Sequence, residues 1–222
     1  MEVIDEEGKK YNTRDLELLS TVGKSSIVYK VDSDKVLKVT DDFTPIRERY
    51  LEIVDELRSE EYSCLIKILS LVKYNDNVCG TLSLRYKHDN NLLHLSIDEL
   101  LSAIFKLEED INRLSSKKIV FYDVFDSANC FVCNNQFVVI DCWDFFEKTH
   151  ATIEEIKKYN QYYLKTLIVE LLLEKTRLYE LCDFLLTLGE EIDSDKTVVR
   201  QFEKHLRKIN TSLYNHFYLD NN

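Results

Sequence analysis

Polar side chains stand at the ends of two apolar runs in the middle of the chain. Asp123, Asp126 and Asn129 precede the run "CFVC", and Asp141 closes the run "QFVVI". Carboxylate and amide oxygens are the ligands that hard cations such as magnesium prefer in proteins. Because both runs have the character of short buried strands, the sequence predicts a cation site where these strands begin and end.

A second set of candidate residues lies near the amino terminus and suits a phosphate. A glycine followed by small polar residues gives a tight turn whose backbone can approach phosphate oxygens. The chain has such a run in Gly23, Lys24, Ser25 and Ser26. The next alternating segment, "KVLKVT", carries Lys38, which we expect to point inward.

Kinase-type phosphoryl transfer needs residues of these kinds in a fixed order. A loop covers the phosphates, and a lysine on the following strand holds them. A carboxylate then orients the attacking hydroxyl, and an Asn and an Asp hold the metal ions. The chain offers Gly23 to Ser26, Lys38, Asp123, Asn129 and Asp141 in that order.

The motifs together resemble the protein-kinase-like fold, and most of all the short kinase-related proteins of bacteria and phages. The likeness extends from about residue 16 to residue 173. "VGKSSIVYKV" resembles the Gly-rich loop, and "KVLKV" resembles the strand with the nucleotide-binding lysine. "IVFYDVFDSAN" resembles the catalytic loop, and "CFVCNNQFVVID" the metal-binding hairpin that follows. "KYNQYYLKTLIVELL" resembles the helix beneath the catalytic loop.

The resemblance implies a function and a role for each matching residue. Asp123 takes the place of the catalytic aspartate, and Asn129 and Asp141 take the places of the magnesium ligands. Residues 23–26 and Lys38 take the places that bind the phosphates of ATP. The implied protein is an ATP- and Mg²⁺-dependent phosphotransferase that moves the γ-phosphate to a hydroxyl group, on a protein substrate or partner.

The catalytic loop departs from the family pattern in its spacing. Asp123 and Asn129 are six positions apart, where the family has five. Alignment back from Asn129 puts Val124 at the catalytic position, which would make the protein inactive, and Asp126 is a third candidate. We assign the role to Asp123 because the apolar pair Ile119–Val120 matches the strand that leads into the catalytic aspartate.

Other departures keep alternative functions open. The Gly-rich loop retains only Gly23, and the D-F-G motif becomes "DCW". Only ten residues separate Asp141 from the helix cap at Thr152, without an A-P-E motif. These features favour a pseudokinase that acts as a nucleotide-binding, scaffolding or regulatory module. The short segment after Asp141 also suits a small-molecule kinase of the aminoglycoside type.

The glutamate that pairs with the nucleotide lysine in active kinases has two candidates. Spacing to the segment "CLIKIL" favours Glu52 or Glu56. The apolar face of the predicted helix centres on Tyr50, Val54 and Leu57, so both glutamates fall away from it on a helical wheel. We assign the role to Glu52.

Strands and helices are distributed unevenly along the chain. The first part predicts a helix from the Thr44–Pro45 cap to Ser59 and strands at 26–31, 35–40, 64–72 and 79–87. The second part predicts a helix from the S-x-x-E box at Ser96 to Leu114, and further helices from the T-x-x-E box at Thr152 onward.

This order of elements predicts an α+β, two-lobed, protein-kinase-like fold. A β-rich lobe with one helix spans residues 1–87 and holds the nucleotide phosphates. A mainly helical lobe spans residues 88–222 and carries the catalytic loop and metal-binding hairpin at 117–146.

Composition restricts the partners and the compartment. The 222 residues carry a formal net charge of -11, which disfavours nucleic acids and anionic membranes as main partners. No apolar run approaches the roughly 18 residues of a membrane span, and "MEVIDEEGKK" lacks the apolar core of a signal peptide. We therefore expect a cytoplasmic protein whose six cysteines are mostly buried, reduced thiols.

Overall fold

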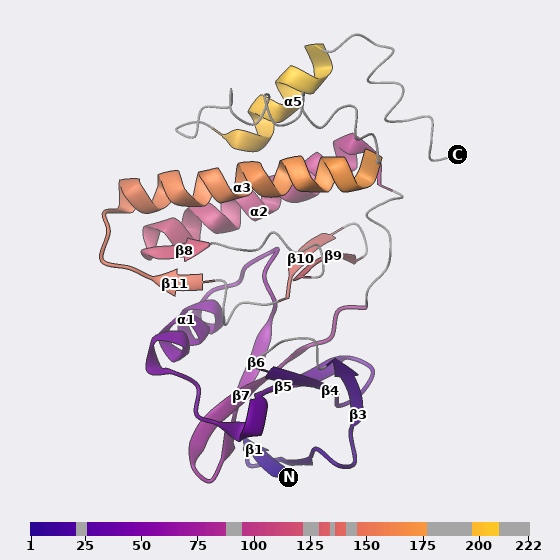
Figure 1. Ribbon diagram of the computed structural model, residues 1–222, viewed down its shortest axis with the longest axis vertical. Helices are drawn as coiled ribbons and strands as arrows, with labels where there is room; N and C mark the ends of the chain where they lie inside the picture. Colours follow the sequence, from indigo (N-terminus) through magenta and orange to yellow (C-terminus); the bar gives the residue numbers. More distant parts are fainter. Residues whose placement is uncertain are drawn as a thin grey trace. The chain divides into compact units, whose positions relative to one another are not determined.

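The computed structural model describes residues 1–20, 26–87, 95–121, 129–133, 136–140, 146–176 and 197–208. The chain forms two compact units. The first comprises Met1–Tyr62 and Ile66–Lys87, and the second comprises Ser63–Leu65 and His88–Asn222. Both units contain strands and helices, so the protein belongs to the α+β class (Figure 1).

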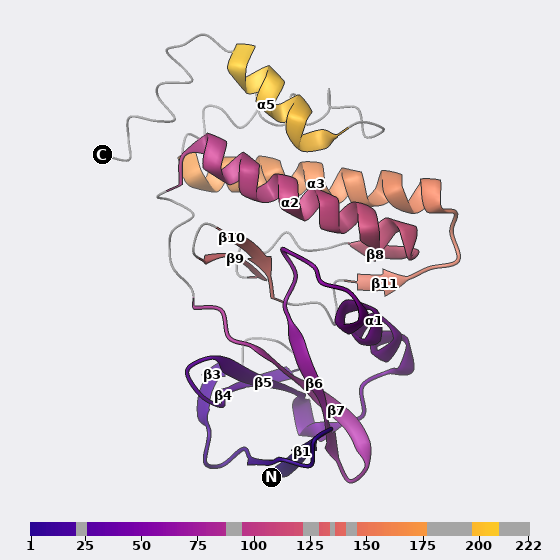
Figure 2. The same cartoon turned by 180° about the vertical axis from the view of Figure 1, so that it is seen from behind.

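The first unit is built on a seven-stranded sheet with the order β2-β1-β6-β7-β5-β4-β3. Every neighbouring pair is antiparallel. Bulges in the β3–β4 and β6–β7 pairs shift the register, which increases twist, and the sheet curls (Figure 2). The strands are β1 (Glu2–Asp5), β2 (Lys10–Asn12), β3 (Glu17–Ser20), β4 (Ser26–Lys30), β5 (Lys35–Thr40), β6 (Ile68–Tyr74) and β7 (Asn77–Leu84).

The predicted strands of this unit are confirmed, although β6 begins and β7 ends several residues inside the predicted bounds. The hairpin between them turns at Asn75 and Asp76, whose φ angles are 49° and 65°. Asn and Asp tolerate this left-handed conformation, and two such residues in succession are typical of a type I′ turn. Alternate strand residues form the core, which contains Val3, Tyr11, Leu37, Val39, Val72, Cys79 and Leu82.

An amino-terminal hairpin that we did not predict extends the sheet beyond β6. Strand β1 pairs with β2 on one side and with β6 on the other, through Ile4 opposite Lys73 and Asp5 opposite Val72. Its strands have only four and three residues, so alternation along them is too short to be a clear signal.

Helix α1 (Glu48–Ser59) begins later than predicted. Thr44 does not cap it, because Thr44 ends a short 3₁₀ turn, η1 (Asp41–Phe43), and the residue before α1 is Arg47. The cause is Ile46, which is buried and donates its backbone N–H to the Val78 carbonyl at 2.8 Å. The bond takes the N–H that a Thr44 cap would have bound, and so ties the segment to β7 in place of the predicted cap.

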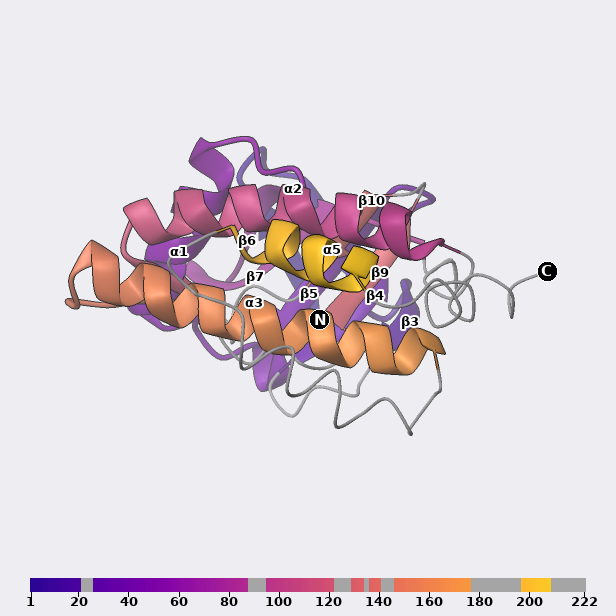
Figure 3. The ribbon, with the colours of Figure 1, turned by 90° about the horizontal axis from the view of Figure 1, so that it is seen from above.

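The described helices of the second unit are α2 (Ile97–Ser116), α3 (Ile153–Thr176) and α5 (Val198–Lys208). Helices α2 and α3 run side by side, and α5 lies against both (Figure 3). Both predicted capping boxes are confirmed, at Ser96 with Glu99 and at Thr152 with Glu155. Among the helices that the structure describes, none combines the length and apolar character that a membrane crossing requires.

Short strands lie beside these helices. The predicted pair is confirmed as the antiparallel hairpin of β9 (Cys130–Cys133) and β10 (Gln136–Val139). Strand β8 (Ile119–Phe121) pairs with β11 (Phe146–Lys148), which we did not predict. Leu65 forms a parallel bridge with Val139 and so joins its short segment to the hairpin.

Candidate functional site

Lys38 lies within the sheet of the first unit, on β5. It pairs with Val28 of β4 and with Thr81 of β7. Its neighbours Leu37 and Val39 are fully buried in the core, and side chains alternate along a strand, so Lys38 lies on the opposite face. Lys38 is half-buried there, rather than enclosed in the core as we expected.

Gly80 on β7 allows the lysine strand to pack closely, and sequence reasoning missed it. A Cβ atom at position 80 would collide with the carbonyl oxygen of Lys38 and would lie 2.9 Å from Val39 Cγ1 and from Val72 Cγ2. The first of these is a backbone atom that cannot turn away. A lone glycine inside a β-rich run is the sequence signal for such an approach.

The predicted phosphate-binding segment is described only at its last residue. Gly23, Lys24 and Ser25 lie outside the described residues. Ser26 begins β4, is buried, and lies opposite Thr40 of β5. Ser26 is therefore the first residue of β4, the strand that pairs with the Lys38 strand β5.

Helix α1 gives its two candidate glutamates different environments. Glu52 is exposed, whereas Glu56 is half-buried and its Oε1 atom is shielded from solvent. The buried face of the helix is formed by Ile53, Val54 and Leu57. Glu56 flanks this face more closely than Glu52 does, at about 100° per residue. Burial thus favours Glu56 as the partner of the nucleotide lysine, whereas we assigned this role to Glu52 from the sequence.

Asn129 is the predicted metal ligand that the structure describes. Outside the described residues lie the other candidates of this segment, Asp123, Val124, Asp126 and Asp141. Asn129 is half-buried and immediately precedes β9. The main-chain carbonyl oxygen of Asn129 accepts the N–H of Ile140 at 3.0 Å. Ile140 is the residue before Asp141 in the sequence.

Asn160 of α3 holds the strand that leads into the predicted catalytic loop. Its side chain is fully buried. Its Oδ1 accepts the N–H of Phe121 at 2.5 Å, and its Nδ2 donates to the Ile119 carbonyl at 3.0 Å and the Ser115 hydroxyl at 2.8 Å. Buried polar groups need such partners because water cannot reach them. Asn160 therefore fixes the end of β8, directly before the loop.

Asp110 of α2 holds strand β10, which ends two residues before the predicted magnesium ligand Asp141 in the sequence. Its Oδ2 accepts the N–H of Cys64 at 2.6 Å. The Cys64 carbonyl in turn accepts the N–H of Val139, the last residue of β10, at 2.8 Å. Asp110 also forms an ion pair with Arg113 of the same helix. The strands on either side of the predicted catalytic segment, β8 and β10, are thus each tied to a helix by a buried side chain.

Cys64 has a structural role at this point. Burial and the neighbouring Asp110 carboxylate raise the pKa of its thiol to about 12, so the thiol stays neutral at physiological pH and is a poor nucleophile. Cys64, Cys79 and Cys130 are all free and buried, which confirms the prediction of buried reduced thiols for these three.

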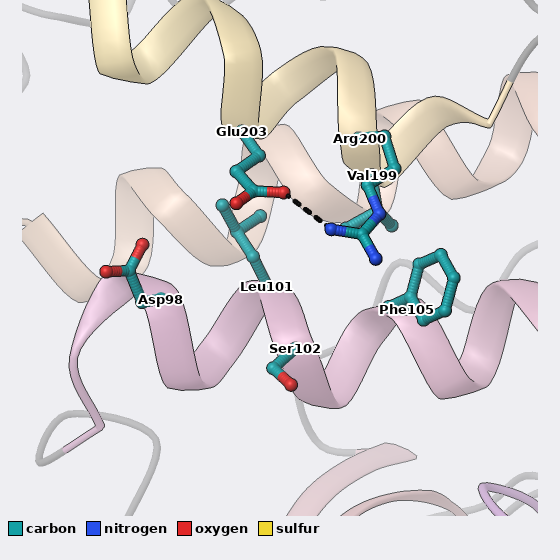
Figure 4. Close-up of a pocket in the computed structure, with 7 residues that line it drawn as sticks. All are labelled: Asp98, Leu101, Ser102, Phe105, Val199, Arg200 and Glu203. Carbon is teal, nitrogen blue, oxygen red and sulfur yellow. Dashed lines mark hydrogen bonds and ion pairs between the residues drawn. The ribbon is translucent and has the colours of Figure 1, made fainter.

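A cavity of about 160 Å³ lies between α2 and α5 (Figure 4). Arg200 pairs there with Glu203 at 3.2 Å and stacks 4.8 Å from the centre of the Phe105 ring. The cavity is smaller than the ~300 Å³ of the smallest usual ligand sites. None of the predicted site residues is among its lining residues Asp98, Leu101, Ser102, Phe105, Val199, Arg200 and Glu203.

Of the two predicted magnesium ligands, Asn129 lies within the described residues and Asp141 lies outside them. Within the described residues, no three His, Cys, Asp or Glu side chains are grouped as a metal site would require. Because Asp123 and Asp141 lie outside them, magnesium binding stays a prediction.

Comparison with known proteins adds no family or relative. A scan against protein-family models finds no match, and a search of the curated proteins finds none either. The functional assignment therefore depends on the motifs and on the geometry described above.

Proposed function

We propose that the chain is a two-lobed phosphotransferase of the protein-kinase-like type, which uses ATP with Mg²⁺ and transfers the γ-phosphate to a hydroxyl group on a protein. The observation that carries the proposal is the hydrogen bond from the Ile140 N–H to the Asn129 carbonyl. It makes Asn129 a neighbour of the residue that precedes Asp141. Kinase-type transfer needs an Asn and an Asp that hold the metal ions together.

The anchoring of the catalytic segment supports the same function. Asn160 fixes the end of β8, and Asp110 fixes β10 through Cys64. Phosphoryl transfer asks a protein chiefly for positioning and for charge stabilisation. Anchored strands on both sides of the segment would provide positioning, and Asp123 would orient the attacking hydroxyl from the loop between them.

The first unit supports the nucleotide side of the proposal. In kinases a Gly-rich loop covers the phosphates, a lysine on a following strand holds them, and a glutamate of the next helix pairs with that lysine. The β3–β4 hairpin, Lys38 on β5 and helix α1 follow one another in this order. Lys38 and residues 23–26 would therefore hold the phosphates of ATP.

Nucleotide binding is tested by thermal unfolding with ATP, in the presence and absence of Mg²⁺. A ligand at about 100 times its Kd stabilises the folded state by ~2.7 kcal/mol. We expect a clear rise in Tm for the wild type, a loss of most of that rise in Lys38→Met, and a loss of its Mg²⁺-dependent part in Asp141→Asn. Lys35→Met, on the same strand, is the matched control and should retain the full rise. A wild-type Tm that ATP leaves unchanged would exclude the proposal.

A phosphate-transfer assay distinguishes an active enzyme from a pseudokinase. The pseudokinase alternative is favoured by the single glycine of the Gly-rich loop and by the "DCW" sequence in place of D-F-G. The measurement is transfer of labelled γ-phosphate to the protein itself and to casein, with an aminoglycoside as the small-molecule acceptor. We expect Asp123→Asn to reduce transfer ~100-fold or more, and Val124→Ala to have little effect. Nucleotide binding without any transfer would indicate a pseudokinase, and transfer to the aminoglycoside alone would indicate a small-molecule kinase.

A further inference from the structure

The turn between β1 and β2 is held in one conformation by its own residues. Asp5 Oδ1 accepts the N–H of Lys9 at 2.8 Å, and Asp5 Oδ2 accepts the hydroxyl of Tyr11 at 2.9 Å. Gly8 has a φ angle of 83°, which a glycine adopts without strain. The turn therefore presents Glu6, which lies between these residues, in one orientation.

The Glu6 carboxylate joins the sheet to helix α1. Its Oε1 and Oε2 atoms accept hydrogen bonds from Nη1 and Nη2 of Arg58 at 3.1 and 2.6 Å. Oε2 also accepts the N–H of Leu71 at 3.0 Å and the hydroxyl of Ser70 at 3.1 Å. Because β1 ends one residue before Glu6, the carboxylate takes the place of a main-chain acceptor for β6.

Glu6 is ionised at neutral pH, which favours its ion pair with Arg58. Partial burial acts to raise the pKa of Glu6, but the Arg58 guanidinium, the Leu71 N–H and the Ser70 hydroxyl outweigh it and hold the pKa below 4.5. Exposed ion pairs usually contribute little, and these side chains are 40% and 27% exposed. Bidentate geometry and two further donors make this pair stronger than an isolated one.

Arg58 belongs to the last turn of α1, two residues after Glu56. Two residues correspond to about 200° around a helix, so Arg58 and Glu56 flank the buried face on opposite sides. Before the other end of α1, Ile46 is tied to β7. A rotation of α1 that moved Glu56 would also move Arg58 away from Glu6.

We propose that Glu6 is a positioning residue, which through Arg58 fixes the rotation of α1 and with it the place of the Glu56 carboxylate. The inference rests on the proposed function, in which a glutamate of α1 pairs with the nucleotide lysine. The position of this helix controls catalysis in kinases. The amino-terminal hairpin is then part of the nucleotide site's machinery and not only an extension of the sheet.

The test combines two measurements on the full chain. Hydrogen exchange reports the opening of α1, and calorimetry reports the Kd for Mg²⁺-ATP. We expect Glu6→Gln and Arg58→Ala each to speed exchange over residues 48–59 about 3- to 10-fold and to raise the Kd by a similar factor. The double variant should add little to either single one, because both remove the same pair. Arg58→Lys should be intermediate.

Glu7→Gln is the matched control, because it removes the same charge from the same turn and leaves the pair with Arg58 intact. Exchange in α1 that is equal in Glu6→Gln and Glu7→Gln would overturn the inference. Faster exchange with an unchanged Kd would also overturn it, because Glu6 would then be structural only. If the wild type binds no Mg²⁺-ATP, the proposed function fails, while the exchange data still decide whether Glu6 holds α1.

Discussion

The two units hold most of their segments in place by different means, although the Glu6 carboxylate also joins β6 and α1 within the first unit. In the first unit a continuous antiparallel ladder joins seven strands, and the buried polar residues are chiefly hydroxyls: Thr13, Ser26, Ser70, Thr81 and Ser83, together with Asp5. In the second unit single buried acids and amides extend from the helices to separate segments. Asn160 holds β8, Asp110 holds Cys64, and Glu108 holds the start of α5.

Glu108 shows the second arrangement at a helix end. It is only 1% exposed, and its two carboxylate oxygens accept the N–H groups of Val198 and Val199 at 2.6 and 3.3 Å. These are the first residues of α5, where N–H groups have no partner within the helix. A negative charge at a helix amino terminus is also favourable.

The difference indicates where each unit is vulnerable. In an antiparallel ladder many main-chain hydrogen bonds hold each strand, so the loss of one side chain leaves these hydrogen bonds in place. A segment held by one buried side chain loses its partner when that side chain is removed, and the buried donors left behind are costly. The first unit should instead be sensitive where two backbones approach closely, as they do at Gly80.

The largest effect is expected at Asn160. Asn160→Leu leaves the Phe121 N–H and the Ile119 carbonyl buried without their partner, so we expect the free energy of unfolding to fall by about 3–4 kcal/mol. Urea denaturation measures this change. Asn160→Asp retains an acceptor for Phe121 and should cost less. A loss below about 1 kcal/mol in the leucine variant would mean that Asn160 does not anchor β8.

Gly80 tests the vulnerability of the first unit. Gly80→Ala forces a methyl group against the Lys38 carbonyl, so we expect a loss of about 2–3 kcal/mol in the free energy of unfolding. Gly8→Ala is the control, because a Cβ there meets no atom within 4 Å although the φ angle is positive. The control should cost about 1 kcal/mol. Equal costs at both positions would contradict the close approach of β5 and β7.

Glu108 adds a dependence on pH. Burial raises the pKa of its carboxyl above 4.5, against the opposing effect of the Val198 and Val199 N–H groups. The Glu108 carboxyl therefore binds its proton more tightly in the folded state than in the unfolded state. The stability that Glu108 contributes through this difference declines as pH rises from about 4.5 to the raised pKa.

Glu108→Ala should cost about 2 kcal/mol at neutral pH because two buried N–H groups lose their acceptor. Glu108→Gln should remove the decline with pH. Urea denaturation at a series of pH values measures both effects. A decline that persists unchanged in Glu108→Gln would assign it to another group.

The smallest effect is expected for an exposed ion pair of the first unit. Lys30 and Glu17 are 2.6 Å apart on β4 and β3, with side chains 34% and 60% exposed. Water screens such pairs, so Glu17→Gln should leave Tm unchanged within error in physiological salt. A clear fall in Tm would show that side-chain pairs also hold this sheet, and it would weaken the contrast between the units.

Sequence reasoning succeeded where a signal is local. The boxes at Ser96 and Thr152 place two helix starts correctly, because each cap joins residues three apart. The same reasoning failed at Thr44–Pro45, where an equally good cap is overridden by the bond from Ile46 to β7. It also did not single out Asn160, which lies in the helix that we expected beneath the predicted catalytic loop.

The sequence by itself determined the α+β class, most of the strands and helices, and the order of the candidate site residues. Only the tertiary structure decided which side chains anchor the strands and helices around the candidate site. Asn160 meets Phe121 across 39 residues, Asp110 meets Cys64 across 46, and Glu108 meets Val198 across 90. A polar side chain becomes an anchor when burial removes water from it and from its partner, and burial depends on segments that are distant in the chain.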